Sequence, residues 1–177
     1  MDVEDDLLRP PPKRAYQYAD IKLHVPFSAL TATFDLLSRV GRRESGLFWY
    51  GPRDSSGNGT VAYVVAPRQR MSWGNYGISA EALAEVVHRL ADDWKPLAQV
   101  HSHPGSRVEH SNYDDRMVSS RRALSLVFPF YGRVRQPFPT GIGIHEWQSD
   151  YWHLLDQASA ALRVLIINGA AQVDDLR

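Results

Sequence analysis

Residues 96–114 read PLAQVHSHPGSRVEHSNYD, and this stretch decides how the rest of the chain is interpreted. Its first part, Pro96–Val100, is short and apolar, which predicts a buried strand that runs into His101. His101 and His103 are two residues apart, so on a strand both side chains point to the same face. Pro104 then ends the strand. The stretch therefore predicts two imidazoles that converge at a strand end, an arrangement that suits zinc.

A carboxylate follows at a distance that lets it join the two histidines. Asp114 comes 11 residues after His103, close enough for the chain to fold back and supply a third ligand. Two His and one Asp leave a fourth tetrahedral position for water, as in catalytic zinc sites. Ser111 and Asp114 also fit the Ser-x-x-acid pattern of a helix N-cap, a purely structural alternative that is compatible with metal binding. Glu109 and His110 lie nearby, but nothing in the sequence fixes their direction.

Outward from this stretch, predicted strands alternate with two or three helices. Helices are predicted after Ser28 as far as Gly41, from Ser79 to Trp94, and from Ser111 to about Ala123. The further strands are predicted at Tyr16–Val25, Glu44–Tyr50, Thr60–Ala66, Leu124–Phe130, Gly141–Trp147, Tyr151–Leu155 and Leu162–Asn168. Arg68–Gly77 and Tyr131–Thr140 are predicted as loops. The pattern favours an α/β (α+β) fold in which helices pack on a mixed sheet.

Length and composition fit one globular domain. The chain has 177 residues, of which 44% are apolar, and the run Pro10–Pro12 follows an acidic start. We therefore predict a flexible N-terminal arm over residues 1–14 and a single domain over residues 15–177.

Charge and cysteine content exclude several classes of function. Lys plus Arg and Asp plus Glu are both 20, so neither nucleic acid nor an anionic membrane is an expected partner. The absence of cysteine excludes thiol nucleophiles, disulfides and Cys-ligated zinc. No secretory signal or membrane-length apolar run is seen, so a cytoplasmic location is expected.

Taken as a whole, the pattern resembles the JAMM motif of the JAB/MPN metalloproteases. That motif is an upstream Glu, then His-x-His-Pro, six residues, Ser, two residues and Asp, and residues 101–114 match it without a gap. Glu44 supplies the upstream acid, since it lies 57 residues before His101 and opens a short apolar segment with two glycines. The resemblance extends over about residues 20–168.

The resemblance implies a fold, a cofactor and a role for each matched residue. The fold would be a central mixed, curved β-sheet flanked by two or three helices, the cytidine deaminase-like architecture of JAB/MPN domains. His101, His103 and Asp114 correspond to ligands of one Zn²⁺ per chain. Glu44 corresponds to the general acid/base that takes a proton from the attacking water and gives it to the leaving amine. Ser111 corresponds to the group that stabilises the oxyanion.

The resemblance also implies a substrate class. Family members hydrolyse amide bonds, often the isopeptide bond after the C-terminus of a ubiquitin-like protein, in precursor processing or deconjugation. The compact chain resembles stand-alone prokaryotic members, which accompany activating and conjugating enzymes in bacterial antiviral operons. Three alternatives stay open: a non-catalytic MPN scaffold that binds partners, a DNA-associated role as in RadC-like proteins, and a zinc peptidase acting on small peptides or sulfur-carrier conjugates.

Overall fold

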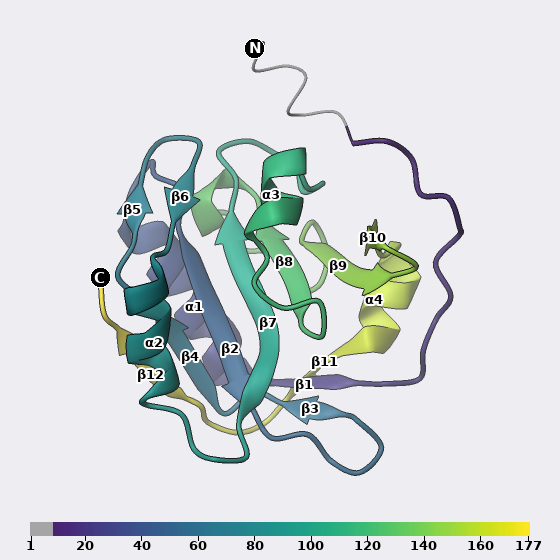
Figure 1. Cartoon of the computed structure of the whole chain (residues 1–177), viewed down its shortest axis with the longest axis horizontal. Helices are drawn as coiled ribbons and strands as arrows, with labels where there is room; N and C mark the ends of the chain where they lie inside the picture. Colours follow the sequence, from purple (N-terminus) through teal and green to yellow (C-terminus); the bar gives the residue numbers. More distant parts are fainter. Residues whose placement is uncertain (1–8) are drawn as a thin grey trace.

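The computed structural model describes residues 9–177, and in this part of the chain a seven-stranded mixed sheet forms the centre (Figure 1). Its strands lie in the order β10 (Tyr151–Leu154), β9 (Gly143–Gln148), β8 (Leu124–Phe128), β7 (Lys95–Ser102), β2 (Gly46–Gly51), β4 (Tyr63–Ala66) and β12 (Gln172–Asp175). β7 pairs parallel with β8 and β4 pairs parallel with β12, whereas the other neighbours are antiparallel. The predicted mixed α/β fold is confirmed.

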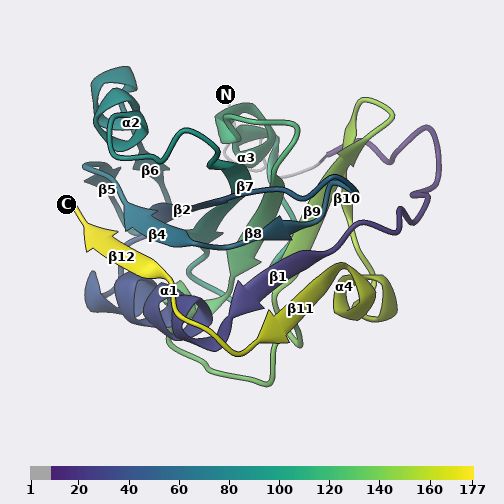
Figure 2. The same ribbon diagram turned by 90° about the horizontal axis from the view of Figure 1, so that it is seen from below.

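Two helices cover opposite faces of this sheet, with α1 (Phe27–Arg39) below the strands and α2 (Ala80–Val87) above them in Figure 2. β2 shows why both faces are buried. Leu47 and Trp49 belong to the core that includes α1, while Phe48 and Tyr50 pack with Val86 of α2. Alternate residues of a strand point to opposite faces, so an unbroken apolar run such as β2 is what a sheet covered on both faces requires.

The connection between β7 and β8 positions the candidate site. Because these strands are parallel, the chain must cross over one face of the sheet between them, and α3 (Asn112–Met117) lies on that crossover. In β7, Val100 faces the α1 core, so its neighbour His101 faces the other side, where α3 lies. The parallel pairing thus brings the end of β7 and the start of α3 together.

Smaller elements complete the fold. A three-stranded sheet has the order β11 (Val164–Ile167), β1 (Leu23–Pro26) and β3 (Gly59–Thr60), and α4 (Gln157–Arg163) precedes β11. β5 (Arg70–Met71) and β6 (Tyr76–Gly77) form a hairpin, and a short 3₁₀ turn, η1 (Phe130–Gly132), follows β8. Within residues 9–177, none of the helices combines the length and the apolar character needed to cross a bilayer.

Several predicted elements were wrong in length or kind. α2 ends at Val87, not Trp94, because the apolar residues Leu90 and Trp94 reach the core from turns. α3 ends at Met117, not Ala123, because the Gln99 side chain bonds the Met117 carbonyl and the Ser119 N–H in place of further helical bonds.

Other differences lie in the hairpin, the first strand and the C-terminal region. The predicted loop Arg68–Gly77 contains the β5–β6 hairpin, and the predicted strand Tyr16–Val25 pairs only from Leu23. The sequence did not reveal α4 or β12. β12 is mostly exposed, so it lacks the apolar alternation that marks a strand. Residues 1–8 of the predicted arm lie outside the described residues.

Candidate metal centre

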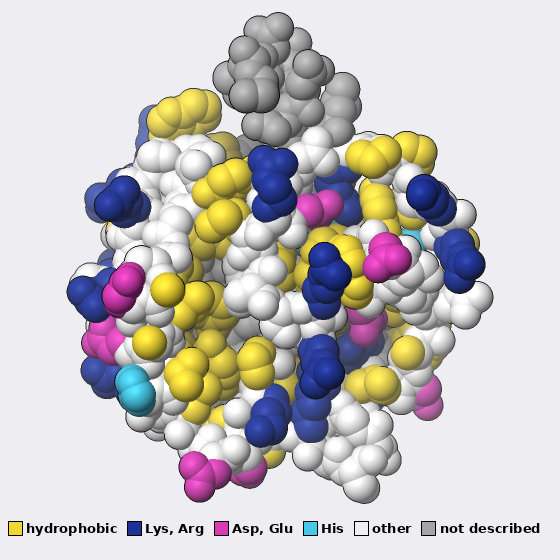
Figure 3. All heavy atoms as spheres, viewed as in Figure 1, with side chains coloured by type: hydrophobic (Ala, Val, Ile, Leu, Met, Phe, Trp, Pro, Cys, Tyr) yellow, Lys and Arg dark blue, Asp and Glu magenta, His cyan; other side chains and the backbone are white. Residues whose placement is uncertain are grey.

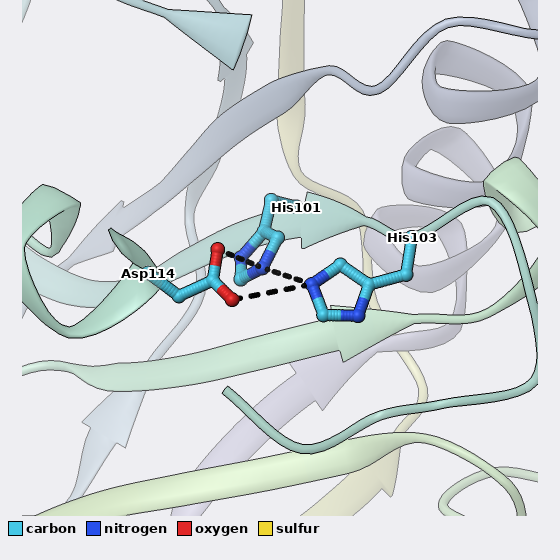
Figure 4. Close-up of side chains that lie close together, drawn as sticks. All are labelled: His101, His103 and Asp114. Atoms are coloured by element: carbon cyan, nitrogen blue, oxygen red, sulfur yellow. Dashed lines mark hydrogen bonds and ion pairs between the residues drawn. The ribbon is translucent and has the colours of Figure 1, made fainter. Parts of the chain in front are cut away.

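His101, His103 and Asp114 lie together at the junction of β7 and α3 (Figure 4). Their ligand atoms all lie within 4.8 Å of one another, and this is the metal-ligand cluster found among residues 9–177. The Nε2 atoms of the two histidines are 3.1 Å apart. The Asp114 carboxylate is 3.3 Å from Nε2 of His101 and 3.4 Å from Nε2 of His103. The three predicted ligands are therefore brought together by the fold.

Strand pairing on both sides fixes His101. It lies opposite Gly46 of β2 and Val127 of β8, and only 1% of its surface is exposed. The Tyr76 ring of β6 stacks on the imidazole with the ring centroids 5.7 Å apart. A Cβ at Gly46 would lie 2.3 Å from the Tyr76 ring, so a glycine is needed for the ring to reach His101.

The main chain after β7 sets the orientation of His103. Its Nδ1 is 3.0 Å from the carbonyl oxygen of Arg107. A carbonyl only accepts, so Nδ1 carries the proton and Nε2 keeps its lone pair toward Asp114 and His101. A backbone carbonyl that holds the outer nitrogen of a histidine is the usual support of a metal-ligating imidazole.

The start of α3 fixes Asp114. Ser111 is the N-cap, and its hydroxyl accepts a hydrogen bond from the Asp114 N–H at 3.1 Å. In return, the Ser111 N–H and hydroxyl donate to Asp114 Oδ2 at 2.6 Å and 2.8 Å, which completes a capping box. The predicted cap is confirmed. The cap holds Oδ2, which also faces His103, while Oδ1 faces His101.

Burial and the closeness of the three groups shift the pKa of each. Burial opposes the charged form of Asp114, but His101 and His103 outweigh it and hold the pKa of that carboxyl well below its usual range. Burial lowers the pKa of His101. Burial acts in the same direction on His103, but the Asp114 carboxylate prevails, because it attracts the protonated ring and accepts a hydrogen bond from its Nε2–H, so the pKa of His103 is raised. The cluster therefore presents an anionic oxygen and imidazole nitrogens to one point.

Glu44 lines the same cleft, just before β2. The cleft has a volume of about 490 Å³, and its walls include Glu44, Trp73, His103, Ser111 and Asp114. Glu44 is 7% exposed, and its N–H donates to the Ser72 carbonyl at 2.7 Å. Burial raises the pKa of Glu44 to about 7, opposed by His103 and reinforced by the charge of Asp114. Four of the five residues predicted for the site, His103, Asp114, Glu44 and Ser111, thus line one cleft. The fifth, His101, is buried behind the cleft wall, against His103 and Asp114.

One face of the molecule carries mixed charge. On the face seen in Figure 3, basic and acidic side chains are interspersed with apolar ones. Trp73 is the most exposed large apolar side chain in the described part of the chain, at 75%, and it stands on the hairpin turn beside the cleft. The Tyr131 hydroxyl donates to the Trp73 carbonyl at 2.7 Å, while the Tyr131 N–H donates to the His103 carbonyl, so this loop ties the hairpin to the ligand segment.

A second polar cluster, which we call the buried histidine cluster, lies behind the metal centre and was not foreseen. It consists of His110, Asp115, Ser125 and His145. His110 Nδ1 is 2.8 Å from Asp115 Oδ1, and its Nε2 is 2.8 Å from the Ser125 hydroxyl. The rings of His110 and His145 stack with centroids 3.8 Å apart, and neither nitrogen of His145 has a hydrogen-bond partner among the described residues. Of its members, the sequence analysis named only His110, as a residue beside the motif whose direction nothing fixed.

Comparison with known proteins gives likenesses in fold and in sequence. No family model matches the chain. It is 35% identical over 112 residues to a protein of Sinorhizobium fredii named probable metalloprotease y4jG, and the match covers 58% of this chain and 66% of that protein. The solution structure of protein DSY2949 from Desulfitobacterium hafniense is similar with a TM-score of 0.60 and 13% identity, over 83% of this chain and 94% of that one. The structural likeness confirms the fold alone, and the chain spans just under two thirds of its curated relative.

Proposed function

We propose that this protein is a zinc-dependent hydrolase that cleaves the peptide or isopeptide bond after the C-terminus of a ubiquitin-like protein. The observation that carries the proposal is the convergence of His101, His103 and Asp114 on one point at the wall of a cleft that Glu44 also lines. The relative named as a probable metalloprotease supports the hydrolase part. The ubiquitin-like substrate and a place beside activating and conjugating enzymes in bacterial antiviral defence are supported by the motif resemblance.

The donor set fits zinc. Two imidazole nitrogens and one carboxylate are borderline-soft and hard ligands of the kind zinc takes in catalytic sites, and three of them leave one position open. The Arg107 carbonyl fixes the tautomer that leaves Nε2 of His103 free to coordinate. Bound there, zinc would supply a Lewis acid that activates water and polarises the scissile carbonyl.

Glu44 is suited to move the proton. A general base works best when its pKa is near the working pH, and burial raises the pKa of Glu44 to about 7. At neutral pH, its carboxylate can accept a proton from water and its protonated form can deliver that proton to the leaving amine. The position of Glu44 in the cleft wall with His103 and Asp114 supports this role.

The hydroxyl proton of Ser111 can be donated to either of two acceptors, the Asp114 carboxylate or the substrate. In the structure that proton is donated to Asp114 Oδ2. Rotation about the Cβ–Oγ bond redirects it into the cleft that Ser111 lines, where it can donate to the oxygen of the scissile carbonyl as negative charge develops. The Ser111 N–H still holds Asp114 when the hydroxyl turns away.

The hairpin beside the cleft suits an extended substrate. In the described part of the chain, β5 and β6 pair only with each other, so the hairpin has an outer edge to which a third strand can add. Trp73 offers an exposed aromatic surface at the hairpin turn. We propose that the flexible C-terminal tail of a ubiquitin-like protein lies along this hairpin and enters the cleft with its scissile bond at the ligands.

The test compares wild type with Glu44→Gln on a panel of substrates. The panel holds ubiquitin and bacterial ubiquitin-like proteins with C-terminal amide-linked extensions, together with short peptides, and zinc content is measured on each protein. Glu81→Gln, on the first turn of α2, is the matched control. We expect zinc in all three proteins, cleavage by wild type and Glu81→Gln, and about 10²–10⁴-fold slower cleavage by Glu44→Gln.

The outcomes separate the remaining possibilities. Cleavage of short peptides in preference to the ubiquitin-like fusions would redirect the proposal to a small-peptide or sulfur-carrier zinc peptidase. Zinc without turnover on any substrate would favour a partner-binding scaffold. A wild-type protein without zinc would overturn the ligand assignment.

A further inference from the structure

Arg9, the first residue that the structure describes, is anchored on the body of the domain. Its Nε donates to Asp115 Oδ2 at 2.7 Å, and its Nη2 donates to the Trp152 carbonyl at 2.8 Å. The guanidinium carbon lies 4.2 Å from the centroid of the Tyr151 ring. Its side chain is only 9% exposed. Arg9 is therefore a largely enclosed side chain whose two hydrogen bonds tie the segment at residue 9 to α3 and β10.

The carboxylate that Arg9 holds belongs to the buried histidine cluster. Asp115 Oδ1 bonds His110 Nδ1, and a carboxylate only accepts, so His110 Nδ1 carries the proton. Burial holds the pKa of His110 well below its usual range, so the imidazole is neutral and its Nε2 accepts from the Ser125 hydroxyl. A continuous chain of hydrogen bonds thus runs from Arg9 through α3 to β8.

This chain of hydrogen bonds passes through α3, the helix that carries the metal ligand Asp114. Asp115 is next to Asp114 on α3, which is only six residues long. A helix this short is marginal on its own, so tertiary contacts fix its position. The Ser111 cap holds Asp114 relative to the helix, but it does not hold the helix relative to β7. The Asp115 carboxylate joins α3 both to β8, through His110 and Ser125, and to β10, through Arg9.

We propose that Arg9 is a positioning residue that keeps Asp114 in register with His101 and His103, so that the segment before the domain sets the metal affinity of the site. Without Arg9, a half-buried carboxylate loses its cationic partner and α3 loses its bridge to β10. The inference rests on the metal centre of the proposed function.

The test measures zinc affinity in the full chain by competition with a chromophoric chelator. Outer partners of a metal site typically change its affinity by about 10–100-fold, and we expect Arg9→Gln to weaken zinc binding by about 10-fold. Arg9→Lys keeps the charge toward Asp115 and should recover part of the loss. Lys13→Gln, on an exposed residue of the same segment, should bind zinc as wild type does. Adding Arg9→Gln to Asp115→Asn should weaken binding no further than Asp115→Asn alone.

Melting of the zinc-free proteins separates positioning from general stability. If Arg9→Gln lowers the melting temperature and leaves zinc affinity unchanged, Arg9 only stabilises the fold and the inference is wrong. Equal weakening by Lys13→Gln, or full additivity with Asp115→Asn, would also overturn it. If wild type itself binds no zinc, the proposed function fails first and the inference fails with it.

Discussion

The metal centre and the buried histidine cluster are built from the same residue types but have opposite surroundings. Each contains histidine, aspartate and serine, and they are close neighbours, with the rings of His101 and His110 5.9 Å apart. In the metal centre, lone pairs converge on one point at the wall of a cleft. In the buried cluster, Ser125, His110 and Asp115 form a linear chain resembling the order of a hydrolase triad, but Ser125 is 0% exposed. Access and convergence, more than residue type, distinguish a reactive site from a structural one.

Loss of a metal ligand should have the largest effect on zinc binding and hydrolysis. It should also show most clearly how the metal centre differs from the buried histidine cluster. We expect His103→Ala to reduce bound zinc from about one per chain to near none and to abolish hydrolysis, because two protein ligands remain. His88→Ala removes an exposed histidine at the end of α2 and serves as the control. Metal analysis after dialysis measures both. Full zinc in His103→Ala would place the metal elsewhere.

The two serines offer the most direct comparison. Ser111→Ala should raise the barrier to hydrolysis by about 2.7–4 kcal/mol through the oxyanion. It should also cost about 1 kcal/mol of stability through the helix cap. Ser125→Ala should leave kcat unchanged and cost about 1–3 kcal/mol of stability, because His110 Nε2 loses its buried donor.

Steady-state kinetics and denaturant unfolding on both serine variants separate these effects. A large fall in kcat for Ser125→Ala with zinc retained would show that the buried cluster takes part in the reaction.

Glu44 should lower the stability of the folded protein as the pH rises and its buried carboxyl group becomes charged. Its pKa rises from 4.5 unfolded to about 7 folded, so the folded state binds the proton more tightly and stability falls as pH increases through this window. Above pH 7 the charged carboxylate therefore lowers the free energy of unfolding by about 3 kcal/mol, because each unit of pKa shift corresponds to about 1.36 kcal/mol. Zinc-free Glu44→Gln should therefore be more stable than wild type at pH 8, with the gap closing toward pH 5. Urea unfolding at both pH values checks this, and a gap that does not depend on pH would contradict it.

Two glycines test how tightly each cluster is packed. A Cβ at Gly46 would lie 2.3 Å from the Tyr76 ring, and one at Gly143 would lie 2.3 Å from the Val108 carbonyl oxygen and 3.1 Å from His145. Overpacking of this kind costs about 1–3 kcal/mol, so both Gly→Ala variants should melt earlier. Only Gly46→Ala should also weaken zinc binding, since Tyr76 stacks on His101. Equal zinc affinities in the two variants would remove Tyr76 from the support of the site.

The metal centre could be predicted from the sequence because most of its residues lie close together along the chain. His101, His103, Ser111 and Asp114 lie within one short stretch, where strand alternation and cap spacing limit which side chains can meet. The supports could not be predicted in the same way. Arg9 meets Trp152 across 143 positions of sequence, and His110, just before α3, meets His145 of β9. The spacing of apolar residues along the sequence does not indicate which distant residues will meet.

Errors in element lengths have a related cause. α3 stops where the side chain of Gln99, a residue of β7, takes over its hydrogen bonds, and this tertiary contact overrides the local pattern. β12 forms because β4 offers it an edge, although its own residues are mostly exposed. Where the core determines the pattern, as in β2 and β8, the strand lies within a few residues of its predicted place.

The parallel pairs β1–β11 and β4–β12 have a consequence for how the chain folds. Leu23 pairs with Val164, and Tyr63 pairs with Gln172, so the two outer strands near the C-terminus close onto segments made much earlier. Contacts so distant in sequence slow folding, because the loop between them must close before they form. During synthesis, the segments that hold the three ligands leave the ribosome well before β11 does. Nascent chains that stop before β11 should therefore expose the unpaired edge of β1, and should depend on chaperones more than the finished chain does.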